Sequence, residues 1–157
     1  MGLIGIWKAY NELHDLGWVT ESPPRLTVAQ TEGAAPVVRA IHQGGSEHEP
    51  WDAPDFIAKG VEIPDPGASP WMLDAVNETD SAGVAVSDED AIEAAIEMAQ
   101  KDGIEMCVTA AVELAGAIKR AENGAYDSDE QIVIINTGAD VKTSARLGHA
   151  AQSQLRE

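Results

Sequence analysis

The chain has 157 residues, a length that suits one compact domain and is short for two. Apolar residues make up 44% of it, enough for a hydrophobic core, which argues against a disordered chain. Asp and Glu number 27 against 10 Lys and Arg, so the formal net charge is -17. Such a surface repels nucleic acids and anionic lipids, and we expect neither as a partner.

The sequence also predicts the compartment. The single cysteine, Cys107, cannot form an internal disulfide, which suits a reducing environment. No segment approaches the roughly 20 apolar residues that span a bilayer, and the first residues do not form a signal peptide. We therefore expect a cytoplasmic protein that does not enter a membrane.

The first third of the chain predicts a helix, a strand and a second helix. Apolar residues recur at helical spacing from Leu3 to Leu13, and Gly17 predicts the end of that helix. The run at residues 26–29 predicts a short strand. Residues 34–41 predict a helix that tolerates Pro36 because this proline falls in the first turn.

A long loop is expected over residues 42–66, where prolines and glycines interrupt any periodicity and allow at most a short helix near Phe56. The next helix is predicted over residues 71–77, with Ser69 as N-cap and Pro70 at the first helical position. A short strand follows at residues 83–86.

Two helices and a strand are expected after that. Ser87 with Asp90 resembles a capping box. The first helix would place two glutamates, Glu93 and Glu97, on its outer face. Its inner face would consist of Ile92, Ala95, Ile96 and Ala99. Residues 104–108 are compatible with a buried strand or with the lead into a helix that ends at Asn123-Gly124. The β-branched run at residues 132–135 predicts a strand covered on both faces.

Strands that alternate with helices predict an α/β protein with three α/β/α layers and a mostly parallel sheet. Ligands of such sheets bind beyond the carboxyl ends of the strands. Asn136, Thr137 and Gly138 occupy one such end. Their position alone leaves two interpretations open, a solvated turn or a ligand contact.

Other candidate sites are weaker. The polar residues His42, Glu47, His48, Glu49 and Asp52 share one loop but lack a recognised metal-ligand spacing, so we expect no metal site.

Cys107 lies among apolar residues without a nearby basic partner in the sequence, which disfavours a nucleophilic role. Neither common Gly-rich phosphate loop is present.

Five segments resemble threonine synthases, which are PLP enzymes of the tryptophan synthase β-subunit fold (fold type II). They follow that family's order and reach nearly to residue 147. The segments are LIGIWKAY (3–10), QTEGAAPVVR (30–39), GVEI (60–63) with Pro66 and Trp71, DGIEM (102–106) through Ala115-Gly116, and IINTG (134–138).

The resemblance implies a pyridoxal 5'-phosphate site. In that family the threonine of the Thr-Gly turn contacts the pyridine nitrogen, which here is Thr137, flanked by Asn136 and Gly138. Gly2 and Gly5 would border the phosphate-binding loop, where backbone amides and a helix N-terminus hold the anion. Asp140 departs from the family, which usually has a second glycine at that place.

The family's Schiff-base lysine stands in an earlier Ser-Phe-Lys stretch that no lysine of this chain matches. The resemblance therefore implies that residues 1–157 form one domain, the C-terminal part of the PLP-binding large domain, with no catalytic residue of its own. The complete enzyme would convert O-phosphohomoserine to threonine and phosphate, and it could be a homo-oligomer. The alternatives are a related PLP lyase such as threonine dehydratase, or a non-catalytic binding or dimerising remnant.

The acidic residues are spread along the chain, which we interpret as adaptation to a salty cytoplasm; an ordinary acidic protein is the alternative. Self-repulsion at a charge of -17 destabilises the compact state, and salt screens it. We expect the free energy of unfolding, measured by urea titration, to rise steadily as KCl increases from dilute buffer to molar concentrations. Equal stability across that series would contradict the hypothesis.

Overall fold

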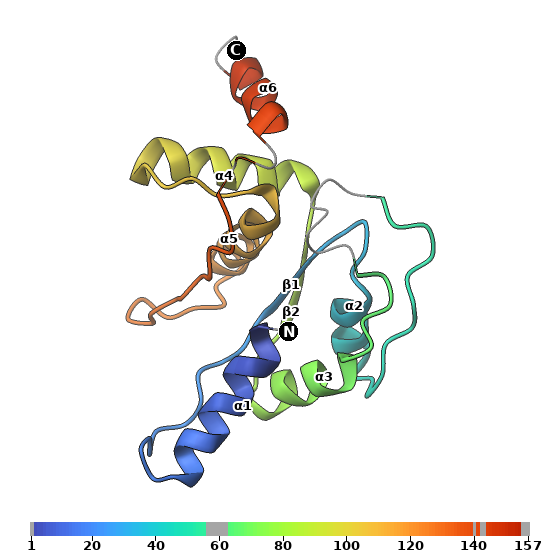
Figure 1. The fold of residues 1–157 in the computed structure, drawn as a ribbon, viewed down its shortest axis with the longest axis vertical. Coiled ribbons are helices and arrows are strands. Elements are labelled where there is room, and N and C mark those ends of the chain that lie inside the picture. Colours follow the sequence, from blue (N-terminus) through green and yellow to red (C-terminus); the bar gives the residue numbers. More distant parts are fainter. Residues whose placement is uncertain (1, 56–62, 140, 142–143, 155–157) are drawn as a thin grey trace.

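The computed structural model describes residues 2–55, 63–139, 141 and 144–154. Helices surround two short strands (Figure 1). In chain order the elements are α1 (Gly2–Asp15), β1 (Val28–Thr31), α2 (Pro36–Gln43), α3 (Ser69–Glu78), β2 (Gly83–Val86), α4 (Asp88–Asp102), α5 (Val108–Glu122) and α6 (Ser144–Gln154).

Strands β1 and β2 form the middle layer. They pair in parallel, with Val28 opposite Gly83 and Thr31 opposite Val86. Because successive strand side chains face opposite sides, the pair has two buried faces. Val28 packs with α2 and α3, whereas Val84 and Val86 pack with α4 and α5. The α/β fold class with helices on both faces of a parallel sheet is confirmed.

Two glycines allow the helices to approach the strands closely. A Cβ on Gly116 of α5 would lie 2.8 Å from Val84 Cγ1 and 3.2 Å from Ala29 Cβ. On the other face, a Cβ on Gly83 would lie 3.1 Å from Val38 Cα in α2. A larger residue at either position would push a helix off the sheet.

A strand side chain caps α2. The N-cap residue of this helix, Ala35, has no side-chain acceptor, and Pro36 begins the helix. Gln30 of β1 supplies the acceptor instead, because its Oε1 receives hydrogen bonds of 3.0 Å from the backbone N–H groups of Val37 and Val38. The start of α2 is therefore fixed to the sheet.

Several local predictions are confirmed. Ser87 caps α4 by accepting a 3.0 Å hydrogen bond from the Asp90 N–H. Gly17 and Gly124 adopt the left-handed conformation after α1 and α5, with φ of +70° and +69°. Residues 104–107 lead into α5, whereas Ala99, predicted to face inward, is exposed.

Two boundaries differ from the prediction. The first strand was expected at residues 26–29 but begins at Val28, because the Leu26 N–H donates to Thr79 Oγ1 rather than to a strand. Ser69 is the first residue of α3 and not its N-cap, which is Ala68. The Ser69 hydroxyl is instead hydrogen-bonded to His48 Nδ1.

The loop predicted over residues 42–66 begins later, because α2 continues to Gln43. Arg39 of α2 holds the loop: it donates a 2.7 Å hydrogen bond to the Glu49 carbonyl and stacks over the Trp51 ring at 4.8 Å. The predicted short helix near Phe56 lies outside the described residues. An additional helix that the sequence did not predict, α6, packs on α4.

The prediction of a strand at residues 132–135 is wrong. The segment forms no strand, and Ile132, Val133 and Ile135 are exposed. A β-strand requires a neighbour for its backbone groups, and the two-stranded β1–β2 sheet does not extend to this segment. Its β-branched composition is therefore strand-like while its backbone is unpaired.

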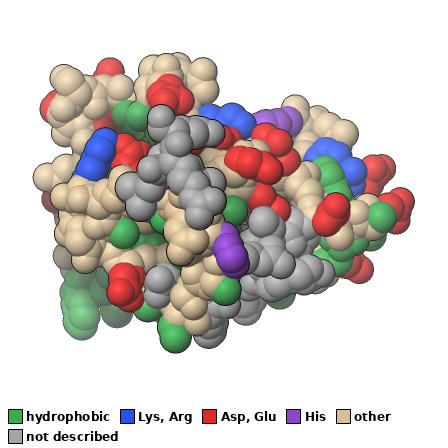
Figure 2. Space-filling view, turned by 90° about the horizontal axis from the view of Figure 1, so that it is seen from above, with side chains coloured by type: hydrophobic (Ala, Val, Ile, Leu, Met, Phe, Trp, Pro, Cys, Tyr) green, Lys and Arg blue, Asp and Glu red, His purple; other side chains and the backbone are tan. Residues whose placement is uncertain are grey.

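No helix in the described ranges is long and apolar enough to cross a membrane. The acidic side chains are scattered over the face shown in Figure 2, with few basic ones between them.

The capping by Gln30 yields a stability prediction. Replacing Gln30 with Ala should lower the free energy of unfolding by about 1–2 kcal/mol, because two N–H groups of α2 lose their acceptor. Gln30→Glu is the matched control, since its carboxylate retains the acceptor and suits the positive end of the helix dipole. Urea titrations at fixed salt measure both. Equal loss in the two variants would contradict the capping role.

Candidate cofactor site

The turn formed by Asn136, Thr137 and Gly138 is held by three hydrogen bonds. Asn136 Oδ1 accepts from the Gly138 N–H at 3.2 Å, and Asn136 Nδ2 donates to the Glu105 carbonyl at 3.0 Å. The Cys107 N–H donates to the Gly138 carbonyl at 2.8 Å. The turn is therefore fixed to the connection between α4 and α5.

Glu113 of α5 holds the chain just before the turn, because its carboxylate accepts a hydrogen bond from the Ile135 backbone N–H. Burial raises the pKa of Glu113 above its ordinary value of 4.5, and the Ile135 hydrogen bond opposes that rise. A half-buried carboxylate thus lies close to the candidate site.

Within this turn Thr137 is the residue free to bind. Its side chain is exposed, and its hydroxyl has no hydrogen bond to the described residues. Gly138 lets the turn lie close to Cys107, because a Cβ on Gly138 would be only 3.3 Å from Cys107 Sγ. A hydroxyl both donates and accepts, so Thr137 can partner a ring nitrogen in either role.

Gly2 and Gly5 lie on another element. Both are exposed in α1, and a Cβ on either would meet nothing within 4 Å. The first turn of α1 contains no acidic residue, which leaves its positive end open to an anion. Helix α1 packs on α3, whereas the turn lies beside the α4–α5 connection, so these two parts of the predicted site are on different elements (Figure 1).

The lysines in the described ranges are paired with carboxylates. Lys8 pairs with Glu12, and Lys101 with Glu97. Lys119 donates to the Ala85 carbonyl at 2.9 Å and to Glu32 at 3.3 Å. Lys59 and Lys142 lie outside the described residues. The ammonium groups of Lys8, Lys101 and Lys119 are thus engaged in ion pairs with carboxylates that do not belong to the turn.

The polar loop residues considered for a metal are engaged elsewhere. His42 bonds the Gly83 carbonyl at 3.1 Å, and His48 bonds Ser69 and Asp65. In the part of the chain that the structure describes, no three His, Cys, Asp or Glu side chains are placed to hold a metal ion.

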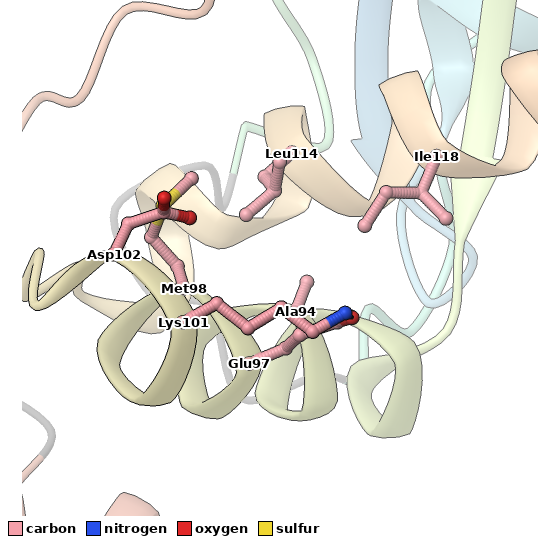
Figure 3. A pocket seen from close by; sticks show the side chains of 7 residues that line it. All are labelled: Ala94, Glu97, Met98, Lys101, Asp102, Leu114 and Ile118. Carbon is pink, nitrogen blue, oxygen red and sulfur yellow. Dashed lines mark hydrogen bonds and ion pairs between the residues drawn. The ribbon is translucent and has the colours of Figure 1, made fainter.

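A shallow groove lies between α4 and α5 (Figure 3). Met98, Leu114 and Ile118 form its apolar floor, and the Lys101–Glu97 ion pair lies at its rim. Its volume of about 150 Å³ is below the roughly 300 Å³ at which pockets for small organic ligands begin. The groove is separate from the turn and offers no group suited to a cofactor.

Comparison with known proteins identifies the class. Residues 2–138 match the family described as pyridoxal-phosphate dependent enzyme. Maize serine racemase has a similar fold, with a TM-score of 0.58 and 19% identity over 84% of this chain and 39% of the racemase chain. The chain therefore belongs to the pyridoxal-phosphate dependent enzyme family.

Particular relatives are threonine synthases. That of Methanocaldococcus jannaschii is 36% identical over 96% of this chain, and that of Methanosarcina acetivorans is 32% identical over 87%. A cysteate synthase of Methanothrix thermoacetophila is 28% identical over 92%. The predicted resemblance to threonine synthases is confirmed. The chain spans 37%, 33% and 36% of these three relatives, respectively.

Sequence analysis missed the residues that hold the turn. Cys107 is the N-cap of α5 and Glu113 lies within α5, both more than twenty residues before the turn. One signal was available: Glu113 is a charged residue within the apolar pattern of α5, and a charged residue that becomes buried usually has a specific partner.

The raised pKa of Glu113 predicts a pH-dependent stability. Because the pKa of Glu113 is higher in the folded than in the unfolded chain, its protonated carboxyl favours the folded state. This contribution to the free energy of unfolding is complete below pH 4.5, the ordinary pKa, and is lost as pH rises through the folded pKa. Glu113→Gln keeps an acceptor for Ile135 but cannot ionise. We expect the free energy of unfolding of the variant to rise relative to that of the wild type over this window.

Subtracting the two urea titration series cancels the other carboxylates, which are common to both proteins. A difference that stays constant from pH 4 to 8 would show that Glu113 titrates as an ordinary exposed group.

Proposed function

We propose that this chain is the C-terminal part of a threonine synthase, which uses pyridoxal 5'-phosphate to convert O-phosphohomoserine and water to threonine and phosphate. The family match and the threonine synthase relatives support this assignment. Because the chain spans 37% of the Methanocaldococcus jannaschii enzyme, the activity belongs to the complete fold.

The observation that carries the proposal is the free hydroxyl of Thr137 on a turn fixed by hydrogen bonds. A hydroxyl can partner an unprotonated pyridine nitrogen, whereas an aspartate would keep that nitrogen protonated and strengthen electron withdrawal. The moderated cofactor suits chemistry at the β and γ carbons of the substrate.

Each part of the chain has a role in this proposal. The cofactor, when bound, withdraws electrons from the substrate. Thr137 orients the ring through its nitrogen, with Asn136 and Gly138 keeping the turn in shape. Gly2 and Gly5, at the start of α1, leave backbone room beside the phosphate. The exposed start of α1, with no acidic residue in its first turn, supports that last role.

The Schiff-base lysine is proposed to come from the remainder of the fold. The ion pairs of Lys8, Lys101 and Lys119 support this, because they engage these ammonium groups with carboxylates outside the turn at Thr137. Under this proposal the isolated chain is inactive, and Asp140 is a departure whose carboxylate would weaken cofactor binding. Threonine dehydratase chemistry and a non-catalytic remnant are the competing functions that the assays below separate.

The proposed setting is the cytoplasm of a salt-adapted organism, with a phosphorylated amino acid as substrate and a homo-oligomer as the possible assembly. The formal net charge of -17 and the scattered acidic side chains on the face shown in Figure 2 support salt adaptation.

Thr137 provides the test. We would build a chimera in which residues 1–157 replace the matched region of the Methanocaldococcus jannaschii threonine synthase. Phosphate release from O-phosphohomoserine should fall about tenfold or more in Thr137→Ala, because a lost hydrogen bond of about 1.5 kcal/mol changes a rate by that factor. The unfolding midpoint should not change, since the side chain is exposed.

Thr137→Ser is the matched control, because it keeps the hydroxyl, and it should retain turnover and the absorption spectrum of the bound cofactor. Unchanged turnover in Thr137→Ala would remove Thr137 from the site. A chimera that deaminates threonine but releases no phosphate would favour the dehydratase. A chimera that binds cofactor but catalyses neither reaction would favour the remnant.

A further inference from the structure

Glu113 is a half-buried carboxylate in a part of α5 that is otherwise small and apolar. The buried residues of this helix are Val108, Ala110, Ala111, Val112, Ala115 and Gly116. A carboxylate in such surroundings is destabilising unless it has a hydrogen-bond partner. Glu113 has one, because it accepts from the Ile135 backbone N–H. Its burial is therefore compensated by a contact with the segment that leads into the turn at Thr137.

An apolar contact lies beside this hydrogen bond. Leu114 follows Glu113, Ile134 precedes Ile135, and both pack against one buried cluster. That cluster consists of Met106, Cys107 and Ala110. Figure 1 shows the segment (orange to red) running beside α5. The helix thus holds the segment by an apolar and a polar contact at adjacent residues.

The two contacts constrain the backbone differently. Packing of Ile134 keeps the segment on the helix, but apolar contacts have no preferred direction. A hydrogen bond fixes both the distance and the direction of the Ile135 N–H. Thr137 stands two residues further on, and its side chain is exposed. The position of its hydroxyl is therefore set by the backbone that Glu113 holds.

The other side of Thr137 is fixed by the connection between α4 and α5. The Cys107 N–H donates to the Gly138 carbonyl at 2.8 Å, and Asn136 Nδ2 donates to the Glu105 carbonyl at 3.0 Å. These contacts hold the turn itself. Glu113 adds a side-chain contact on the preceding segment, so the backbone is held both before and after Thr137.

We propose that Glu113 is a positioning residue of the cofactor site: by holding the Ile135 N–H, it sets where the Thr137 hydroxyl meets the ring nitrogen of the cofactor. This inference rests on the proposed function. Glu113 acts through the backbone of residues 135–137 and does not touch the cofactor. A displacement of about 1 Å at a binding group can lower a rate about 10²-fold, so a small shift of Thr137 is sufficient to impair turnover.

The first test uses the full 157-residue chain. In Glu113→Ala the Ile135 N–H loses its acceptor, so the amides of Ile135 and Gly138 should exchange hydrogen at least about tenfold faster than in the wild type. Glu113→Gln keeps an acceptor oxygen and should retain the wild-type exchange rates. Unchanged exchange of both amides in Glu113→Ala overturns the proposal.

The second test uses the chimera with the Methanocaldococcus jannaschii threonine synthase at saturating cofactor. Glu113→Ala should lower kcat for phosphate release about tenfold and alter the absorption spectrum of the bound cofactor, while KM for O-phosphohomoserine changes less than about twofold. Glu113→Gln should restore both kcat and the spectrum. Glu122→Ala is the matched control, because it removes the same residue type from the exposed end of the same helix, and it should behave as the wild type.

A double-mutant cycle shows whether Glu113 acts through Thr137. Adding Glu113→Ala to Thr137→Ala should reduce kcat by less than about twofold beyond Thr137→Ala alone, because the group that Glu113 positions is already absent. Two losses that multiply would assign Glu113 an effect independent of Thr137 and overturn the proposal. Glu113→Leu fills similar space without an acceptor and should match Glu113→Ala, so it replaces that variant if the unfolding midpoint of Glu113→Ala falls below the assay temperature.

The outcomes separate this inference from the proposed function. An active chimera in which Thr137→Ala lowers turnover and Glu113→Ala does not would refute the positioning role and leave the proposed function intact. A chimera that binds the cofactor but releases no phosphate counts against the proposed function. The absorption spectra of the Glu113 variants and the exchange of the Gly138 amide then decide whether Glu113 positions the turn.

Discussion

The parallel pairing of β1 and β2 is the constraint on which the rest of the structure depends. Each strand has four residues, and the pair buries Val28 on one face and Val84 and Val86 on the other. Isolated parallel sheets this small are marginal in water, so the helices must supply most of the burial. Gly116 and Gly83 make this possible, because they let α5 and α2 touch the strands directly.

Features encoded by neighbouring residues could be predicted from the sequence. The Ser87 cap of α4 and the left-handed Gly124 after α5 depend on a few residues each, and both are confirmed. Ser69 looked equally clear, but its hydroxyl bonds His48, a residue from the preceding loop. A helix-capping rule based on neighbouring residues fails where a side chain distant in sequence supplies the hydrogen-bond partner. The residues around Ser69 do not indicate that His48 is this partner.

Residues 132–135 show the same limit for strands. Their β-branched composition favours an extended backbone, yet a strand exists only when a second chain segment satisfies its backbone groups. The candidate site divides in the same way. The turn at Thr137 could be located from its place after the apolar run, whereas the contacts from Cys107 and Glu113 arise from the packing of α5 against that run.

The α5 region connects the sheet with the turn. Glu113 of α5 accepts from the Ile135 N–H, two residues before Thr137, and Cys107, the N-cap of α5, donates to the Gly138 carbonyl, one residue after it. Gly116 of the same helix lets α5 pack directly on the strands, because a Cβ there would lie 2.8 Å from Val84 Cγ1. The packing of α5 on the sheet therefore also fixes the backbone on both sides of Thr137.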